Sequence, residues 1–200
     1  MEPRSADITR INSFVELLHT FQKVERIINV PGSDRWENDV EHSYLLAMTA
    51  WYLIDALGMT LDIGKTLRYA LAHDLVEVYA GDTYAYTKNE ALKASKHERE
   101  RKAQMRIEKE FPEFPTLHDA IGAYEEKQDE EARFIYALDK LIPVITVFLQ
   151  NGRTWKEADV AWDEVMDHKR SRIGDAPYIR DLFEQIVALM EHDKQKYFNR

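Results

Sequence analysis

Two histidines and two aspartates of this sequence lie within mainly apolar segments, where a polar side chain needs an explanation. His42 lies in DVEHSYLLAMTAWYL, His73 and Asp74 are adjacent in YALAHDLVEVYAGD, and Asp139 lies in RFIYALDKLIPVITVF. An unpaired carboxylate in a core would cost several kcal/mol, so each of these side chains must have a partner. Taken singly, each has an ordinary explanation. Lys140 can pair with Asp139, and a buried histidine usually satisfies its ring nitrogens within the core.

Taken together, the four side chains could bind one metal ion, because packed helices can bring polar groups from distant segments to one point. The chain has no cysteine, so His, Asp and Glu are its candidate metal ligands. Two imidazoles and two carboxylates suit one divalent transition ion such as Mn, Co, Fe, Ni or Zn, with positions left open for water and a substrate oxygen. Glu77 follows His73 and Asp74 by one helical turn, near enough to hold a water on that ion.

Helices must position these residues, because apolar positions recur at intervals of three and four and only 7 glycines and 6 prolines interrupt the chain. We expect an all-α fold, a single-domain helical bundle over residues 1–200. The metal-site core is expected at about residues 10–150 and the C-terminal helices at residues 154–197. The polar stretch 29–39 is predicted to be a loop. Helices are predicted over residues 40–57, 61–79, 90–110 and 129–149, and the one over residues 90–110, rich in Lys, Arg and Glu, is expected to be largely solvated.

Charge and composition narrow the function classes. Lys and Arg number 27 and Asp and Glu 36, a formal net charge of −9 that argues against extended contact with a nucleic-acid backbone. No apolar run approaches the roughly 18 residues of a membrane-spanning helix, and the N-terminal segment MEPRSADITR lacks the features of a secretory signal. We therefore expect a cytoplasmic protein that does not bind membranes. Trp155, Trp162 and Tyr178 belong either to the core or to a self-association surface.

The order His42, His73-Asp74, Asp139 resembles that of the HD-domain metal-dependent phosphohydrolases. The segments EHSYLLAMTA, HDLVEVYAGD and EEARFIYALDKL are similar to three blocks of the bacterial 5'-deoxynucleotidase branch and its eukaryotic HD-domain-containing relatives. The resemblance covers roughly residues 10–150. It implies an HD-type helical fold in which these four residues bind one divalent metal ion.

The same resemblance implies roles for further residues. Glu77 matches a carboxylate that positions or activates the attacking water, and Asp82 matches an acidic residue near the sugar. Arg26, Arg35 and Lys88 fall where that branch has basic residues around the phosphate, although the match at Arg26 needs a one-residue insertion. Ordinary explanations stand beside these roles, because basic side chains are commonly solvated at the surface and an aspartate after glycine can be a turn residue.

The sequence departs from the deoxynucleotidase pattern near the expected sugar and base positions. Ile27 replaces a tryptophan, and Thr83-Tyr84-Ala85-Tyr86 replaces a proline-rich turn. The resemblance therefore supports metal-dependent hydrolysis of a phosphate ester more strongly than a deoxynucleoside monophosphate substrate.

The leading function is cleavage of the phosphate monoester of a nucleotide, with a (deoxy)nucleoside 5'-monophosphate as the expected substrate. Two other readings remain open. One is an HD-type nucleotide triphosphohydrolase or phosphodiesterase, and the other is a non-catalytic helical binding protein with a vestigial metal site. The expected partners are a small phosphorylated substrate and, from the resemblance, further copies of the chain in a homodimer or higher homo-oligomer.

Overall fold

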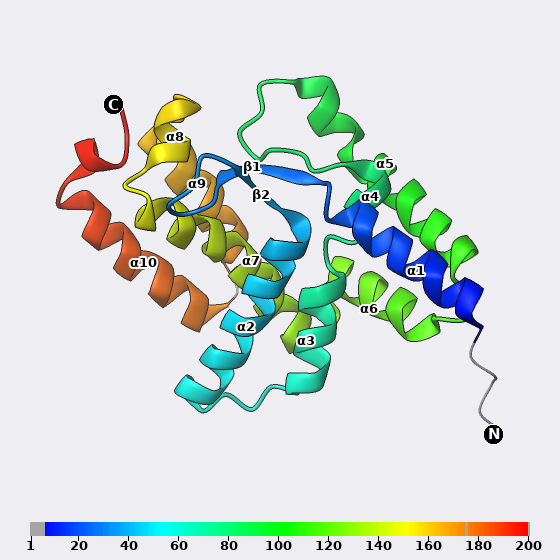
Figure 1. Cartoon of the computed structure of the whole chain (residues 1–200). Helices are drawn as coiled ribbons and strands as arrows, with labels where there is room; N and C mark the ends of the chain where they lie inside the picture. The colour runs from blue at the N-terminus through cyan, green and yellow to red at the C-terminus, as the bar shows by residue number, and fades with distance from the viewer. Residues whose placement is uncertain (1–6, 175, 200) are drawn as a thin grey trace.

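The computed structural model describes residues 7–174 and 176–199, and it is all-α apart from one small hairpin (Figure 1). The predicted all-α fold is confirmed. Four helices form the central part: α2 (Asp39–Leu57), α3 (Ile63–Ala72), α7 (Glu130–Leu149) and α9 (Trp162–Ile173). The other helices are α1 (Ile8–Phe21), α4 (Glu77–Ala80), α5 (Glu90–Glu110), α6 (Pro115–Glu125), α8 (Arg153–Glu157) and α10 (Pro177–Glu191), followed by a 3₁₀ turn at Lys194–Lys196.

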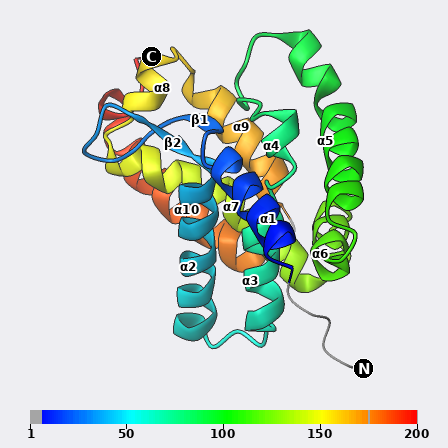
Figure 2. The same ribbon diagram turned by 45° about the vertical axis from the view of Figure 1, so that its right-hand side comes forward.

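The central helix α7 is buried because α2, α3, α9 and α10 pack against it (Figures 1 and 2). Its apolar side chains from Phe134 to Val147 contribute to one continuous core. Asp139 is buried among these side chains. The fold thus places a carboxylate close to the centre of the molecule, where it must have a partner.

Three of the predicted helices match the observed ones closely. Residues 40–57 correspond to α2, which stops at Gly58, where a φ of 61° lies in the left-handed region that glycine adopts without strain. Residues 90–110 correspond to α5, whose side chains are mostly exposed, and residues 129–149 to α7. None of the helices in the described part of the chain has both the length and the apolar character needed to cross a membrane.

The polar stretch predicted to be a loop contains part of a hairpin. Strand β1 (Glu25–Asn29) pairs antiparallel with β2 (Trp36–Asn38), with Arg26 opposite Glu37. The pairing is irregular between Arg26 and Asn29, and β1 does not alternate between buried and exposed side chains. The sequence of β1 therefore lacks the alternation of apolar and polar residues by which a strand is predicted. The hairpin places Arg26 beside the first turn of α2.

The predicted helix over residues 61–79 is interrupted. α3 ends at Ala72, residues 73–76 form successive turns, and α4 begins at Glu77. The amide of His73 still bonds to a carbonyl four residues back, whereas the Glu77 amide bonds to the carbonyl of Asp74, three residues back. The chain is therefore wound more tightly after His73 than in an α-helix. His73 and Asp74 lie at the end of α3 rather than inside a continuous helix.

Two further differences lie in the second half of the chain. α6 was not predicted because its first residue is Pro115, yet proline is well tolerated at the first position of a helix, where its missing N–H needs no partner. The predicted C-terminal helix from residue 154 is divided into α8 and α9, and Asp159 between them has a φ of 48°. Trp155 is a core residue, 3% exposed and stacked on Phe198, whereas Tyr178 is exposed.

Candidate metal centre and pocket

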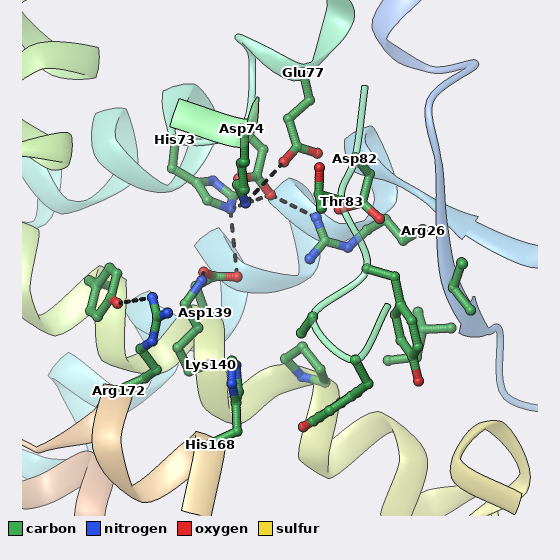
Figure 3. A pocket seen from close by; sticks show the side chains of 18 of the residues that line it. Arg26, His73, Asp74, Glu77, Asp82, Thr83, Asp139, Lys140, His168 and Arg172 are labelled. Atoms are coloured by element: carbon green, nitrogen blue, oxygen red, sulfur yellow. Dashed lines mark hydrogen bonds and ion pairs between the residues drawn. The ribbon is translucent and has the colours of Figure 1, made fainter. Parts of the chain in front are cut away.

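The four predicted ligands converge on one point. One potential ligand atom from each of His42, His73, Asp74 and Asp139 lies within 4.8 Å of the others. His42 Nε2 is 3.0 Å from Asp139 Oδ1, and His73 Nε2 is 2.9 Å from Asp74 Oδ2. Figure 3 shows His73, Asp74 and Asp139 directed toward a common centre. Three elements contribute: α2, the turn after α3, and α7.

Local structure fixes the start of α2 and therefore the position of His42. Asn38 accepts a hydrogen bond from the Glu41 amide, and the Glu41 side chain accepts one from the Asn38 amide, so the two residues form a capping box. His42 follows in the first turn of the helix and is fully buried. The sequence WEND before VEH is thus the local reason for this histidine's position.

The outer ring nitrogens of both histidines face other acceptors. His73 Nδ1 lies 2.9 Å from the carbonyl oxygen of Ala70, and His42 Nδ1 lies 3.5 Å from Glu37 Oε2. Protons on these nitrogens leave the Nε2 lone pairs directed at the cluster. Partners of this kind orient metal-binding histidines in proteins.

The donor set fits a divalent cation. His73 Nε2 is buried and makes no hydrogen bond with any described residue, although Asp74 Oδ2 is close. Imidazole lone pairs and carboxylate oxygens repel one another unless a proton or a cation lies between them. Two imidazoles and two carboxylates match the preferences of Mn, Fe, Co, Ni and Zn. These four residues could therefore hold one such ion.

Two cations already pair with the aspartates. Lys140 Nζ is 2.5 Å from the second oxygen of Asp139, and Arg26 Nη1 is 2.7 Å from Asp74 Oδ2. Burial opposes ionisation, but the charges of Lys140 and the two histidines hold the pKa of Asp139 well below its usual range. Burial also opposes the ionisation of Asp74, but the contacts with His73 and Arg26 together outweigh it and lower the pKa of Asp74. Both carboxylates are therefore ionised and able to bind a cation.

Asp39 is a site residue that the sequence analysis missed. It is fully buried at the start of α2, and one of its carboxylate oxygens is 3.0 Å from Arg26 Nη1. Together with Asp74 and Glu77 it forms a second cluster of three carboxylates. Burial, and then the charge of Asp74, raise its pKa to about 6. An acidic residue in the first turn of a helix is common, so its type and position gave no distinctive signal.

Glu77 lies beside the cluster and is 3% exposed. Its Oε1 is 3.9 Å from Lys96 Nζ, and its Oε2 has no hydrogen-bond partner within the described chain. Burial, together with the charges of Asp74 and Asp82, raises its pKa well above the usual value. A carboxylate with a raised pKa suits proton transfer near neutral pH. Asp82 also lines the pocket, and burial raises its pKa despite the opposing charge of Arg26.

Of the three basic residues expected around a phosphate, the structure brings only Arg26 to the pocket. Arg35 is 53% exposed and its guanidinium binds Glu41 through contacts of 2.6 and 2.7 Å. Lys88 is exposed and lies outside the pocket lining. Arg35 therefore supports the capping box of α2 instead of facing the cluster.

The cluster opens on a cavity of about 610 Å³. Aromatic side chains form part of its wall, including Tyr84 and Tyr86, whose ring centroids are 5.4 Å apart. His97 and His168 also line it. The acidic lining residues are Asp74, Glu77, Asp82, Glu100, Glu125 and Asp139. The basic lining residues are Arg26, Lys93, Lys96, Lys127, Lys140, Lys169 and Arg172.

Comparisons with known proteins place this site in a family. A sequence profile described as "HD domain" matches residues 18–180. The fold is similar to the crystal structure of "Predicted metal-dependent phosphohydrolase" from Magnetospirillum magnetotacticum MS-1, with 31% identity and a TM-score of 0.72 over 94% of this chain and 97% of that one. No match was found among curated proteins.

Two archaeal structures share the fold at lower identity. A conserved hypothetical protein from Pyrococcus furiosus is 20% identical, with a TM-score of 0.58 over 88% of this chain and 99% of that one. A protein from Pyrococcus horikoshii OT3 is 20% identical, with a TM-score of 0.61 over 90% of this chain and 98% of that one. The profile match spans most of the chain and includes every histidine and aspartate of the cluster. The chain therefore belongs to the HD-domain family.

Proposed function

We propose that this chain is a metal-dependent phosphohydrolase that cleaves the phosphate monoester of a nucleotide, with a nucleoside 5'-monophosphate as the expected substrate. The observation that carries the proposal is the His-Asp cluster opening on a cavity of about 610 Å³ that also contains Glu77 and Arg26. The cavity volume lies within the range of small-molecule sites, roughly 300–1,000 Å³. The name printed for the Magnetospirillum protein, a predicted metal-dependent phosphohydrolase, supports the phosphohydrolase part of the proposal.

The buried position of the cluster suits hydrolysis. A divalent ion held by His42, His73, Asp74 and Asp139 would supply Lewis-acid chemistry, lowering the pKa of a bound water and offsetting charge on a phosphate oxygen. The histidines and aspartates are held by partners on their outer sides, including Lys140 and the carbonyl of Ala70. Such partners keep the ligand atoms in place for binding.

Glu77 is the residue that we assign to proton transfer. One carboxylate oxygen of Glu77 lies within 4.8 Å of oxygens of Asp39 and Asp74, and Glu77 Oε2 has no hydrogen-bond partner in the described chain. Glu77 can therefore accept a proton from a water near the cluster. Arg26 lines the pocket beside Asp74 and can donate to a phosphate oxygen, for which a planar guanidinium is well suited. Lys96, near Glu77, adds positive charge at the same end of the pocket.

The remaining pocket wall fits the nucleoside part of a substrate. Asp82 lies in the lining, consistent with the contact to the sugar that the deoxynucleotidase resemblance implies. Tyr84 and Tyr86 follow it and offer aromatic surface against which a base could pack. Ile27 is part of the lining as well, so the residue that departs from the deoxynucleotidase pattern borders the cavity. Substrate preference is expected to differ from that branch for this reason.

The proposal is tested by supplying purified protein with Mn²⁺, Co²⁺, Ni²⁺ or Zn²⁺ and measuring phosphate release from nucleoside mono-, di- and triphosphates. We expect orthophosphate from monophosphates. Release of triphosphate would favour a triphosphohydrolase instead, and no turnover with any metal would contradict the proposal.

Variants connect the activity to the site. Asp139→Ala should lose both bound metal, measured by elemental analysis, and turnover. Glu77→Gln should retain metal and lose roughly 10²–10⁴ in kcat, because proton transfer contributes about that factor. Glu184→Gln is the matched control, since this glutamate pairs with Arg170 at the surface. Turnover by metal-free Asp139→Ala protein would refute the assignment.

A further inference from the structure

A lysine occupies a core-facing position of α9. The buried side chains of this helix are Val165, Met166, Lys169 and Ile173, at the spacing of one helix face. Lys169 is 4% exposed, and its ammonium makes no hydrogen bond or ion pair with the residues that the structure describes. It lines the pocket, so the side chain reaches the cavity instead of the outer surface. Buried lysines are rare unless they are paired.

Two further cations, Arg172 and Lys140, lie at the same side of the pocket, with the imidazole of His168, whose pKa is lowered by burial to about 4. Arg172, one turn after Lys169, donates a hydrogen bond to Tyr136 Oη at 3.3 Å but has no carboxylate partner in the described chain. His168 packs against the ring of Tyr86, with centroids 5.4 Å apart. Figure 3 shows Arg172, His168 and Lys140 on the side of the pocket opposite Glu77 and Arg26. Among the described residues, a carboxylate pairs with Lys140, that of Asp139, and with none of the other groups.

The lowered pKa of Lys169 indicates a buried ammonium whose charge is not fully compensated, as expected of a side chain that binds an anion. Burial, followed by the charge of Lys140, lowers its pKa to about 7. A solvated lysine would not incur this penalty, and the opposing charge of Asp139 relieves it only in part. A phosphate oxygen entering from the cavity would restore the charged state through a charge-assisted hydrogen bond.

We propose that Lys169 and Arg172 form an anion subsite that binds a second phosphate group of the nucleotide, in addition to the phosphate at the His-Asp cluster. This inference rests on the proposed function, because it places the scissile phosphate at the cluster. Lys169 is thus a specificity-determining residue: it favours nucleotides with two phosphate groups over monophosphates. The second group can stand in a diphosphate chain or on the opposite side of the sugar.

Calorimetric titration of the Glu77→Gln protein with Mn²⁺ tests the subsite without turnover. Adenosine 5'-monophosphate, adenosine 5'-diphosphate and adenosine 3',5'-bisphosphate serve as ligands, and the last two distinguish the positions of the second phosphate. We expect at least one of them to bind roughly tenfold more tightly than the monophosphate, the effect of one charge-assisted hydrogen bond. Adding Lys169→Met should remove this preference and leave the monophosphate Kd within about twofold.

Arg172→Gln provides a second variant, because Arg172 is exposed and its substitution leaves the core unchanged. It should reduce the same preference. Lys102→Met, on the exposed face of α5, should not. Absence of a preference in the parent protein would overturn the inference, as would a preference that survives Lys169→Met. An equal loss of affinity for the monophosphate and the bisphosphate in the Lys169→Met variant would overturn it too, because Lys169 would then bind the phosphate at the cluster.

Failure of the subsite is distinguishable from failure of the proposed function. Hydrolysis of monophosphates without any preference for a second phosphate refutes the subsite alone. A Lys169-dependent preference in a protein that hydrolyses none of the nucleotides supports anion binding by Lys169 and Arg172 and refutes the phosphohydrolase activity.

Discussion

Replacement of Lys169 by methionine should stabilise the protein, which is the opposite of the usual effect of a core substitution. In the folded protein the pKa of Lys169 falls from an ordinary 10.5 to about 7, first because of burial and then because of Lys140. One pKa unit corresponds to about 1.4 kcal/mol, so the buried lysine costs up to about 5 kcal/mol of folding free energy below pH 7. Methionine has a similar volume, and its own packing cost should stay below about 1.5 kcal/mol. The expected net gain at pH 6 is about 3–5 kcal/mol.

The gain should depend on pH with a defined sign. Between pH 7 and pH 10.5 the unfolded chain keeps a proton on Lys169 that the folded protein has released, so the wild-type stability rises with pH in this window. The methionine variant lacks this contribution. Its advantage over the wild type should therefore shrink by about 3 kcal/mol between pH 6 and pH 9.

Urea denaturation of both proteins at pH 6, 7.5 and 9 measures this difference, with Lys102→Met as a surface control expected to stay within about 0.5 kcal/mol of the wild type. A pH-independent difference below about 1 kcal/mol would mean that water or a partner already satisfies the ammonium of Lys169. A loss of stability in the methionine variant would refute the reasoning outright.

Three other substitutions test separate parts of the structure. Arg35→Ala should leave kcat/KM within about twofold of the wild-type value, because Arg35 binds Glu41 at the surface and does not line the pocket. A larger drop would indicate that Arg35 does contact the phosphate. Trp155→Ala should lower the free energy of unfolding by about 3–5 kcal/mol in urea titrations, since its ring is buried; an unchanged midpoint would contradict that burial. Gly152→Ala should lower the Tm, because a Cβ there would lie 2.0 Å from the Tyr197 carbonyl oxygen, whereas Gly122→Ala meets no atom within 4 Å and should not. Equal Tm changes in the two glycine variants would be inconsistent with this contact.

Helices with a long apolar pattern and no proline at their start, such as α2 and α7, could be predicted from the sequence, and the His-Asp cluster with them. Asp139 is conspicuous because it interrupts a long apolar run, and α7 proved to be buried along that run. The interruption after His73 could not be predicted, because the residues before and after it continue the same apolar pattern. Tighter winding there follows from hydrogen bonds three residues apart, which leave no mark on apolar spacing.

The site residues that sequence analysis missed, in the pocket and in the carboxylate cluster beside it, are cations and acids of types common on helix surfaces. Asp39 and Lys96 stand in polar segments, where a charged side chain has no need of a special partner. Lys169 differs, because Val165 and Ile173 lie four residues before and after it and place it on the apolar face of α9. Helical spacing could therefore have identified it. Arg35 and Lys88 are basic residues like Arg26, and their sequence surroundings do not reveal that their side chains face solvent. The fold was needed to show this.

The charge distribution favours small anions over long polyanions. Basic residues number 27 against 36 acidic ones in the chain, yet seven basic and six acidic side chains line the pocket. Asp74 and Asp139 belong to the cluster, so a divalent ion there would make the lining strongly positive while the rest of the molecule stays negative. A nucleic acid must approach the outer surface along many phosphates and would be repelled. The nucleotide proposed as substrate would instead enter the cavity, which both Arg26 and Lys169 line.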